Sequence, residues 1–390
     1  FVEGYSDGFI SKYDSNGNYL WSFKIGNAAD VYGTGISNCF DFITSICINQ
    51  NNELLVAGAF RGTVDFDPGA GVVAATSINT GNAFFAKYSD SGALIFAKPF
   101  DLLEGAFFNY LDKQLAITSD ADNNIYLAGK FRNTVDLDPG PAVQSFTSSA
   151  HYAFFFAKYT VNGDFEFAKQ LQGNNIFSNA YNAINSIEVD QQKRIFICGN
   201  MGSTFDFDPG LTTFTLPINA QFETNIFLAS YDSIGNLRFA KQCGRTGTVS
   251  NYGRHRVNGM SIDNNSRIYL VGTYDQGGAD FFGKILYTWG STGGWSGYDS
   301  FFAITDSSGN ALLTKGYQVF GLYDYLSTVS IDQQSKPLIA GVIDANIDLS
   351  LSGNQPRIMN CPRFSSVIKC KYTELETNFS LQQGPYVINN

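Results

Sequence analysis

The chain has 390 residues, of which 35 are Phe, 21 Tyr and 39 Gly, whereas only 15% are charged. This composition favours β-sheet joined by tight turns, and no apolar run is long enough to span a bilayer. The formal charge of −10 argues against a nucleic-acid partner, and the two histidines, His151 and His255, exclude a multi-histidine metal site.

One segment recurs along the chain and predicts a β-hairpin in every copy. Apolar and polar residues alternate on both sides of a short Asp/Ser/Asn/Gly turn, which is typical of a hairpin. The six copies lie at 7–26, 82–100, 153–171, 225–243, 299–317 and 366–384. Their aligned residues are Tyr13, Tyr88, Tyr159, Tyr231, Thr305 and Tyr372.

A second hairpin is predicted at 42–60, 115–131, 185–202, 257–274 and 326–343. A polar residue ends its first strand in each copy: Asn49, Asp120, Asp190, Asp263 and Asp332. A glycine follows nine positions later in each copy: Gly58, Gly129, Gly199, Gly272 and Gly341. This constant spacing predicts the strand register.

Each repeat therefore carries four strands, which we name A to D in chain order and which form one blade of a β-propeller. We predict a single all-β domain, 1–390, with six four-stranded blades. The predicted blades are 386–390 with 1–25, 42–100, 114–171, 184–243, 257–317 and 326–384. The C-terminal segment would supply strand A of the first blade, which would close the ring and remove open sheet edges. An open array is the alternative and would need polar caps.

The repeat resembles the SBBP (seven-bladed β-propeller) repeat of bacterial proteins. The resemblance rests on the patterns F-x-A-K-Y-D-x-x-G-N-L, I-x-I-D-x-x-x-x-I-Y-L-A-G-x-F and V-D-F-D-P-G. It covers almost the whole chain and is weakest after about residue 343. It implies a secreted or cell-surface, extracellular bacterial protein and carries no catalytic residues across. The family name implies seven blades, whereas we count six.

A DPG motif follows strand B in three repeats, at 64–69, 135–140 and 205–210. Alternate carboxylates of an extended strand share one face, and together with turn carbonyls they suit Ca²⁺. The other interpretation is a structural turn, in which Asp caps its own backbone, Pro fixes φ and Gly supplies a positive φ. The carboxylates concerned are Asp65, Asp67, Asp136, Asp138, Asp206 and Asp208. No other cofactor is predicted.

The loops from strand D to strand A are the predicted binding site, because we expect strand A to line the central channel. These loops are rich in aromatic residues, which suit sugars or polypeptides but would equally fill gaps between blades. Their basic cluster could hold a carboxylate or sulfate, or offset nearby acidic residues in solvent. The candidate ligand-binding residues are Tyr32, Phe108, Tyr110, Tyr181, Tyr252, Arg254, His255, Arg256, Tyr323 and Tyr325.

The sequence predicts a binding or structural module without catalytic activity, with a protein partner and no membrane span. A lectin-like, carbohydrate-binding propeller is the alternative, but it would repeat one aromatic residue in most blades, which these loops do not. A polysaccharide-processing enzyme would need converging carboxylates or a Tyr/His/Arg set, and the sequence offers no fixed constellation.

Overall fold

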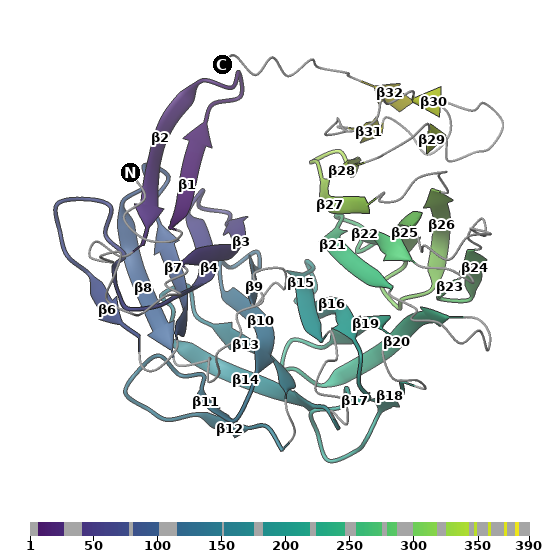
Figure 1. Ribbon diagram of the computed structural model, residues 1–390, viewed down its shortest axis with the longest axis horizontal. Helices are drawn as coiled ribbons and strands as arrows, with labels where there is room; N and C mark the ends of the chain where they lie inside the picture. Colours follow the sequence, from purple (N-terminus) through teal and green to yellow (C-terminus); the bar gives the residue numbers. More distant parts are fainter. Residues whose placement is uncertain are drawn as a thin grey trace, which may run out of the picture.

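The computed structural model describes 7–26, 41–77, 81–100, 115–149, 152–174, 182–218, 224–245, 255–274, 279–286, 299–317, 325–342, 347–348, 358–359, 370–372 and 379–381. Every regular element in these ranges is a β-strand, and none of them contains a helix that could cross a bilayer. The strands form antiparallel sheets arranged around a common centre (Figure 1). The predicted all-β, propeller-like arrangement is therefore confirmed.

Four blades have four full strands in the predicted order A-B-C-D. The first consists of β3 (Phe42–Ile48), β4 (Leu54–Phe60), β7 (Asn82–Tyr88) and β8 (Leu94–Phe100). The second consists of β9 (Leu115–Ser119), β10 (Ile125–Phe131), β13 (Ala153–Tyr159) and β14 (Phe165–Gln172). The third consists of β15 (Ala183–Val189), β16 (Ile195–Met201), β19 (Asn225–Tyr231) and β20 (Leu237–Arg245). The fourth consists of β21 (Arg256–Ile262), β22 (Ile268–Tyr274), β25 (Asp299–Thr305) and β26 (Ala311–Tyr317).

The count of four differs from the six blades predicted, and both ends of the chain account for the difference. At the N-terminal end, β1 (Gly8–Tyr13) and β2 (Tyr19–Ile25) form a two-stranded sheet. At the other end, the sheet of β27 (Tyr325–Ile331), β28 (Pro337–Val342), β31 (Cys370–Tyr372) and β32 (Phe379–Leu381) has short outer strands, and β28 meets β31 at two residue pairs. The repeat loses the aromatic residues of strand C there, since Ile368 and Lys369 align with Phe84 and Phe85 of the first blade. The segments that would close the ring, 1–6 and 382–390, lie outside the described residues.

Short hairpins occupy the predicted inserts between strands B and C. They are β5 (Thr63–Asp65) with β6 (Ala74–Thr76), β11 (Thr134–Asp136) with β12 (Ser145–Thr147), β17 (Phe205–Asp206) with β18 (Thr215–Leu216), β23 (Ala279–Phe281) with β24 (Lys284–Leu286), and β29 (Ile347–Asp348) with β30 (Ile358–Met359). Figure 1 shows the β11–β12 and β17–β18 hairpins at the rim of the ring. The rim hairpins therefore cover the outer side of the blades.

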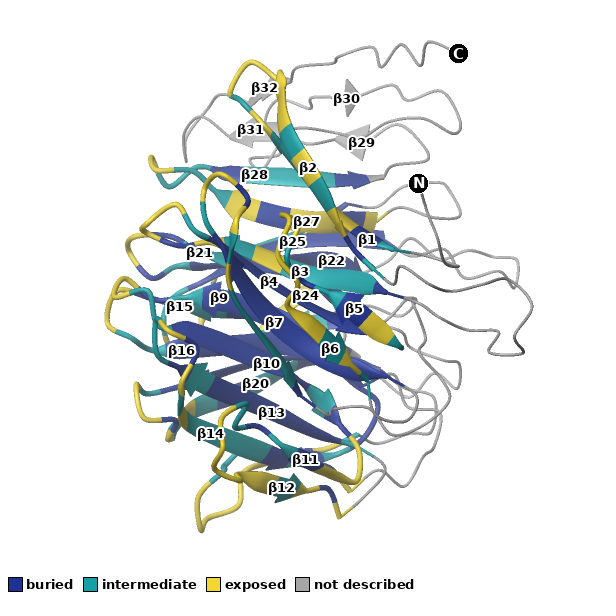
Figure 2. Ribbon diagram, turned by 90° about the vertical axis from the view of Figure 1, so that its left-hand side faces the viewer, coloured by how far each residue is buried: buried dark blue, intermediate teal, exposed yellow. Residues whose placement is uncertain are grey.

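The core lies between the blades and combines aliphatic side chains with many Phe and Tyr rings. In strand C of the second blade, the Tyr159 ring packs on Phe85 of the preceding blade with centroids 4.7 Å apart, and its hydroxyl donates to the Leu137 carbonyl at 2.9 Å. Tyr231 packs on Phe156 in the same way, at 4.4 Å. Figure 2 shows the middle strands, such as β4, β7, β10 and β13, buried, the outer strand β14 largely intermediate and the turns exposed. The repeated Tyr thus joins one blade both to its neighbour and to its own rim hairpin.

The glycine of strand B is required by a bulge in strand A. In the third blade the register shifts between Ile184 and Ser186, opposite Gly199. A Cβ atom on Gly199 would lie 2.0 Å from the Ala183 carbonyl oxygen, so only glycine fits. The constant spacing of polar residue and glycine predicted this register correctly, although it did not predict the bulge.

Candidate functional site

The short A–B and C–D turns lie at the same end of each blade, because the four strands are antiparallel in chain order. We call this end the turn face. In the third blade, Asp190 Oδ1 accepts the backbone N–H groups of Gln192 and Arg194, both at 3.0 Å. The same two bonds form at Asn49, Asp120, Asp263 and Asp332. The polar residues at the ends of strand A therefore cap tight turns.

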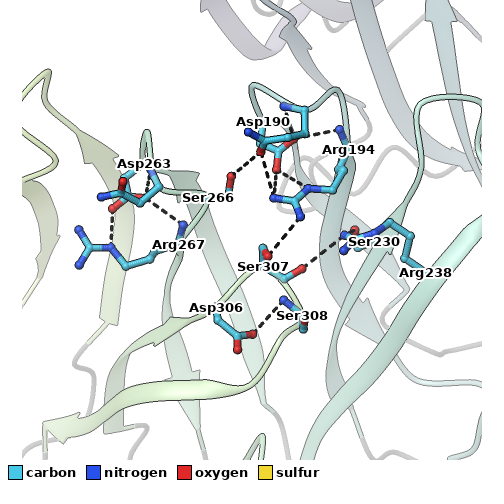
Figure 3. Close-up of polar contacts among 12 residues, drawn as sticks. Asp190, Arg194, Ser230, Arg238, Asp263, Ser266, Arg267, Asp306, Ser307 and Ser308 are labelled. Carbon is cyan, nitrogen blue, oxygen red and sulfur yellow. Dashed lines mark hydrogen bonds and ion pairs between the residues drawn. The ribbon is translucent and has the colours of Figure 1, made fainter.

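Side chains of neighbouring blades connect these turns, as Figure 3 shows for the third and fourth blades. Arg194 donates to Asp190 Oδ2 at 2.6 Å within its own turn and to Ser307 Oγ of the next blade at 3.2 Å. Arg238 donates to Ser230 Oγ at 2.8 Å and to the Ser307 carbonyl at 3.3 Å. Burial and the nearby Arg194 lower the pKa of the Arg238 guanidinium. Both cations therefore hold the C–D turn of the fourth blade.

Lysines make equivalent connections, between the first and second blades and again between the third and fourth. Lys87 Nζ donates to the Val161 carbonyl of the next blade at 2.9 Å and pairs with Glu53 at 3.2 Å. Lys241 Nζ donates to the Gly309 carbonyl at 2.9 Å. These charged groups of the turn face already have partners within the protein, so they fix neighbouring blades together.

The DPG motifs lie at the opposite end of the blades. Asp65 Oδ1 accepts the N–H groups of Asp67 at 3.0 Å and Val73 at 2.8 Å, and Asp67 Oδ1 accepts that of Gly69 at 2.8 Å. The equivalent residues Asp136, Asp138, Asp206 and Asp208 make the same bonds. One oxygen of each carboxylate thus serves the turn. The described ranges contain no group of three or more His, Cys, Asp or Glu side chains that could hold a metal ion, and Ca²⁺ binding stays a prediction.

Most of the predicted ligand-binding residues fall outside the described residues: Tyr32, Phe108, Tyr110, Tyr181, Tyr252, Arg254 and Tyr323. The structure places the other three at or just before the start of strand A. The His255 side chain is buried, and its backbone N–H donates to the Thr224 carbonyl at 3.0 Å. Arg256 is half-buried and Tyr325 is exposed. Burial gives His255 a structural position, whereas a binding role for Arg256 and Tyr325 stays a prediction.

The inner strands of the blades enclose a site that the sequence analysis did not identify. Strands β3, β9, β15, β21 and β27 lie side by side around the centre of the ring (Figure 1), as expected for strand A. Strands β1, β3, β9 and β15 line a cavity of about 500 Å³, which we call the axial cavity. Its lining combines apolar side chains with hydroxyl groups and one carboxylate: Ile43, Ile117, Ile187, Ser11, Ser186 and Glu188.

Glu188 is the charged residue of the cavity lining. Its Oε2 atom accepts the hydroxyl of Thr118, on the neighbouring strand β9, at 3.3 Å. Burial by the surrounding protein raises the pKa of Glu188 to about 7, and the hydrogen bond from Thr118 offsets part of this shift. The side chain is nevertheless half-buried and lines the cavity. Cys47 lies beyond Thr118, with its Sγ 4.0 Å from the Thr118 hydroxyl. Burial and the Glu188 charge raise the pKa of the Cys47 thiol.

The repeat alignment contains a signal that could have revealed Glu188. This residue lies two positions before the turn residue Asp190. The residues at the same place in the other inner strands are small and neutral: Cys47, Thr118, Ser261 and Ser330. This single carboxylate in a series of neutral side chains distinguishes the third blade from the others in charge.

No protein-family model matches the chain, so membership of the SBBP repeat family is not shown. The chain is 25% identical, over 286 residues, to an uncharacterized WD repeat-containing protein of Acanthamoeba polyphaga mimivirus. The match covers 66% of this chain and 19% of that protein, so the chain spans about a fifth of its relative. The similarity agrees with a repeat protein of the propeller class.

Two solved structures show only weak similarity to the chain. A protein of unknown function from Bacteroides caccae matches with a TM-score of 0.29 and 10% identity, over 81% of this chain and 91% of that one. The extracellular domain of a hybrid two-component system protein of B. thetaiotaomicron matches with a TM-score of 0.24 and 12% identity, over 89% of this chain and 47% of that one. Similarity at these TM-scores supports no conclusion about fold or function.

Proposed function

We propose that this protein is a non-catalytic β-propeller module that binds a protein partner at the centre of its ring. The similarity to a WD repeat-containing protein supports this proposal, because WD repeats are propeller blades. The secreted or cell-surface location belongs to the proposal as well. It rests on the resemblance of the repeat to the SBBP pattern.

The observation that carries the proposal is the axial cavity, to which three blades and the N-terminal hairpin contribute. A propeller places residues of separate repeats around one axis, so a single ligand there contacts several blades at once. The cavity volume of about 500 Å³ falls within the range of about 300–1,000 Å³ for ligand pockets. It accommodates a protruding side chain of a partner better than a flat surface would.

Selection of peptides from a displayed random library on the immobilised chain tests the proposal. A glycan array, probed with the same preparation, tests the lectin alternative. We expect one family of related peptides to bind the folded chain, with no binding to the thermally unfolded chain and no glycan signal. Glycan binding without peptide binding, or turnover of a polysaccharide, would contradict the proposed function.

A further inference from the structure

The axial cavity has a lining with a distinct chemical character. Ile43, Ile117 and Ile187 give it aliphatic walls, and they come from three different inner strands. Glu188 supplies the charge of this lining. A cavity of this kind complements a ligand that is aliphatic along its length and cationic at its end.

Glu188 has no cation as its partner within the described part of the chain. It accepts a hydrogen bond from the neutral hydroxyl of Thr118, which occupies one carboxylate oxygen. By contrast, Glu166 on the outer strand β14 pairs with Lys158 at 2.7 Å, as an ordinary surface carboxylate of this protein does. A carboxylate withdrawn from water is costly unless a charged partner compensates it. Protonation, which the raised pKa favours, compensates the carboxylate in the unbound protein, and in the ionised form a cation from outside the described residues would do so.

We propose that the axial cavity binds a Lys or Arg side chain of the partner protein, with its cationic group on Glu188 and its aliphatic stem along the isoleucines. This inference rests on the proposed function, since it names the chemistry of the partner. A charge-assisted hydrogen bond to a carboxylate is stronger than a neutral one, and the net charge of −10 attracts a basic partner.

The bound cation requires Glu188 in its ionised form. Cys47 on β3 is the titratable group coupled to Glu188 among the described residues, and its raised pKa keeps the thiol neutral near pH 7. Thr118 on β9 does not titrate in this range. Because the pKa of Glu188 is about 7, affinity for the cation falls as the pH drops from 8 to 6. A partner held elsewhere on the ring would not follow this profile.

Fluorescence anisotropy with two labelled peptides tests the inference on the full chain. One is a five-residue peptide with Arg between glycines, and the other carries neutral citrulline in place of Arg. Glu188→Gln keeps the shape of the side chain, and Glu166→Gln removes a carboxylate far from the cavity. We expect the Arg peptide to bind wild type and Glu166→Gln alike, and to bind Glu188→Gln at least tenfold more weakly. The citrulline peptide should bind wild type and both variants as weakly as the Arg peptide binds Glu188→Gln.

Circular dichroism establishes that Glu188→Gln is folded. Agmatine, a small molecule with the guanidinium group of Arg, distinguishes a free cation from the side chain of a protein. Equal binding of both peptides, equal binding by wild type and Glu188→Gln, or no binding of the Arg peptide at millimolar concentration would overturn the inference. Binding of agmatine without the peptide would overturn the assignment to a protein side chain. If library peptides bind wild type and Glu188→Gln equally well, the proposed function stands, but the inference that a cation binds Glu188 is overturned. If no library peptide binds, the proposed function itself fails.

Discussion

The N-terminal hairpin β1–β2 and the C–D hairpins of the full blades share one sequence pattern but differ in burial. Phe9 in β1 is 75% exposed, whereas its equivalents Phe84, Phe155, Phe227 and Phe301 are at most 1% exposed. Tyr13 is 56% exposed and its equivalent Tyr88 is fully buried. What covers Phe84 lies outside its own hairpin, since it packs against Phe60 of strand B and Phe66 of the rim hairpin.

The difference teaches that a repeat residue becomes a core residue only when its strand B, rim hairpin and preceding blade surround it. The described part of the chain pairs β1 with β2 alone. The hairpin nevertheless supports the first blade, because Phe23 of β2 packs on Tyr88 at 4.7 Å. The hairpin therefore packs on the first blade through Phe23 of β2, whereas Phe9 and Tyr13 of β1 stay exposed.

The largest expected effect contrasts two equivalent phenylalanines. Phe227→Ala removes a fully buried ring, so it should lower the free energy of unfolding by about 3–5 kcal/mol. Phe9→Ala removes an exposed ring and should cost less than about 1 kcal/mol. Urea denaturation followed by circular dichroism measures both. An equal loss for Phe9→Ala would break the comparison, and it would indicate that the C-terminal segment 385–390 covers this hairpin, as ring closure requires.

The axial cavity, where the hairpin meets the full blades, gives an effect of intermediate size. The folded pKa of Glu188, about 7, lies above its ordinary value of 4.5, so folding favours the protonated form. Stability from this group is complete below about pH 4.5 and is lost as the pH rises through 7, by roughly 2–3 kcal/mol. Glu188→Gln should remove this dependence when unfolding is measured from pH 5 to pH 8. If the free energy of unfolding depended on pH in the same way in wild type and in Glu188→Gln, a raised pKa of Glu188 would be contradicted.

The smallest expected effect concerns the glycines of the C–D turns. Gly17 in the hairpin and Gly163 in the second blade both have positive φ, of 85° and 79°, so an alanine strains both backbones alike. A Cβ on Gly163 would lie 2.9 Å from Phe96 of the preceding blade, whereas one on Gly17 would meet nothing within 4 Å. Gly163→Ala should therefore cost about 1 kcal/mol more than Gly17→Ala in thermal unfolding. Equal costs would show that the preceding blade yields without penalty.

The sequence predicted much of the blade and little of the site. The spacing from Asp190 to Gly199 predicted the pairing of strands A and B, because both residues serve local backbone geometry. The blade count failed because it relied on weak copies of the pattern near both ends, and a pattern does not report whether neighbouring strands are present. The sequence did not predict a role for Glu188, because this residue belongs to no motif and its surroundings are formed by other blades, including its hydrogen-bond partner Thr118.

Blocking the axial cavity tests the central claim most directly. Ile46 lines the cavity and is 58% exposed, so Ile46→Trp fills space there with little effect on folding. Ile95, 46% exposed on the outer strand β8, provides the matched control Ile95→Trp. For a peptide selected on the wild-type chain, we predict at least a tenfold loss of affinity with Ile46→Trp and none with Ile95→Trp. Unchanged affinity for Ile46→Trp would contradict binding at the centre of the ring.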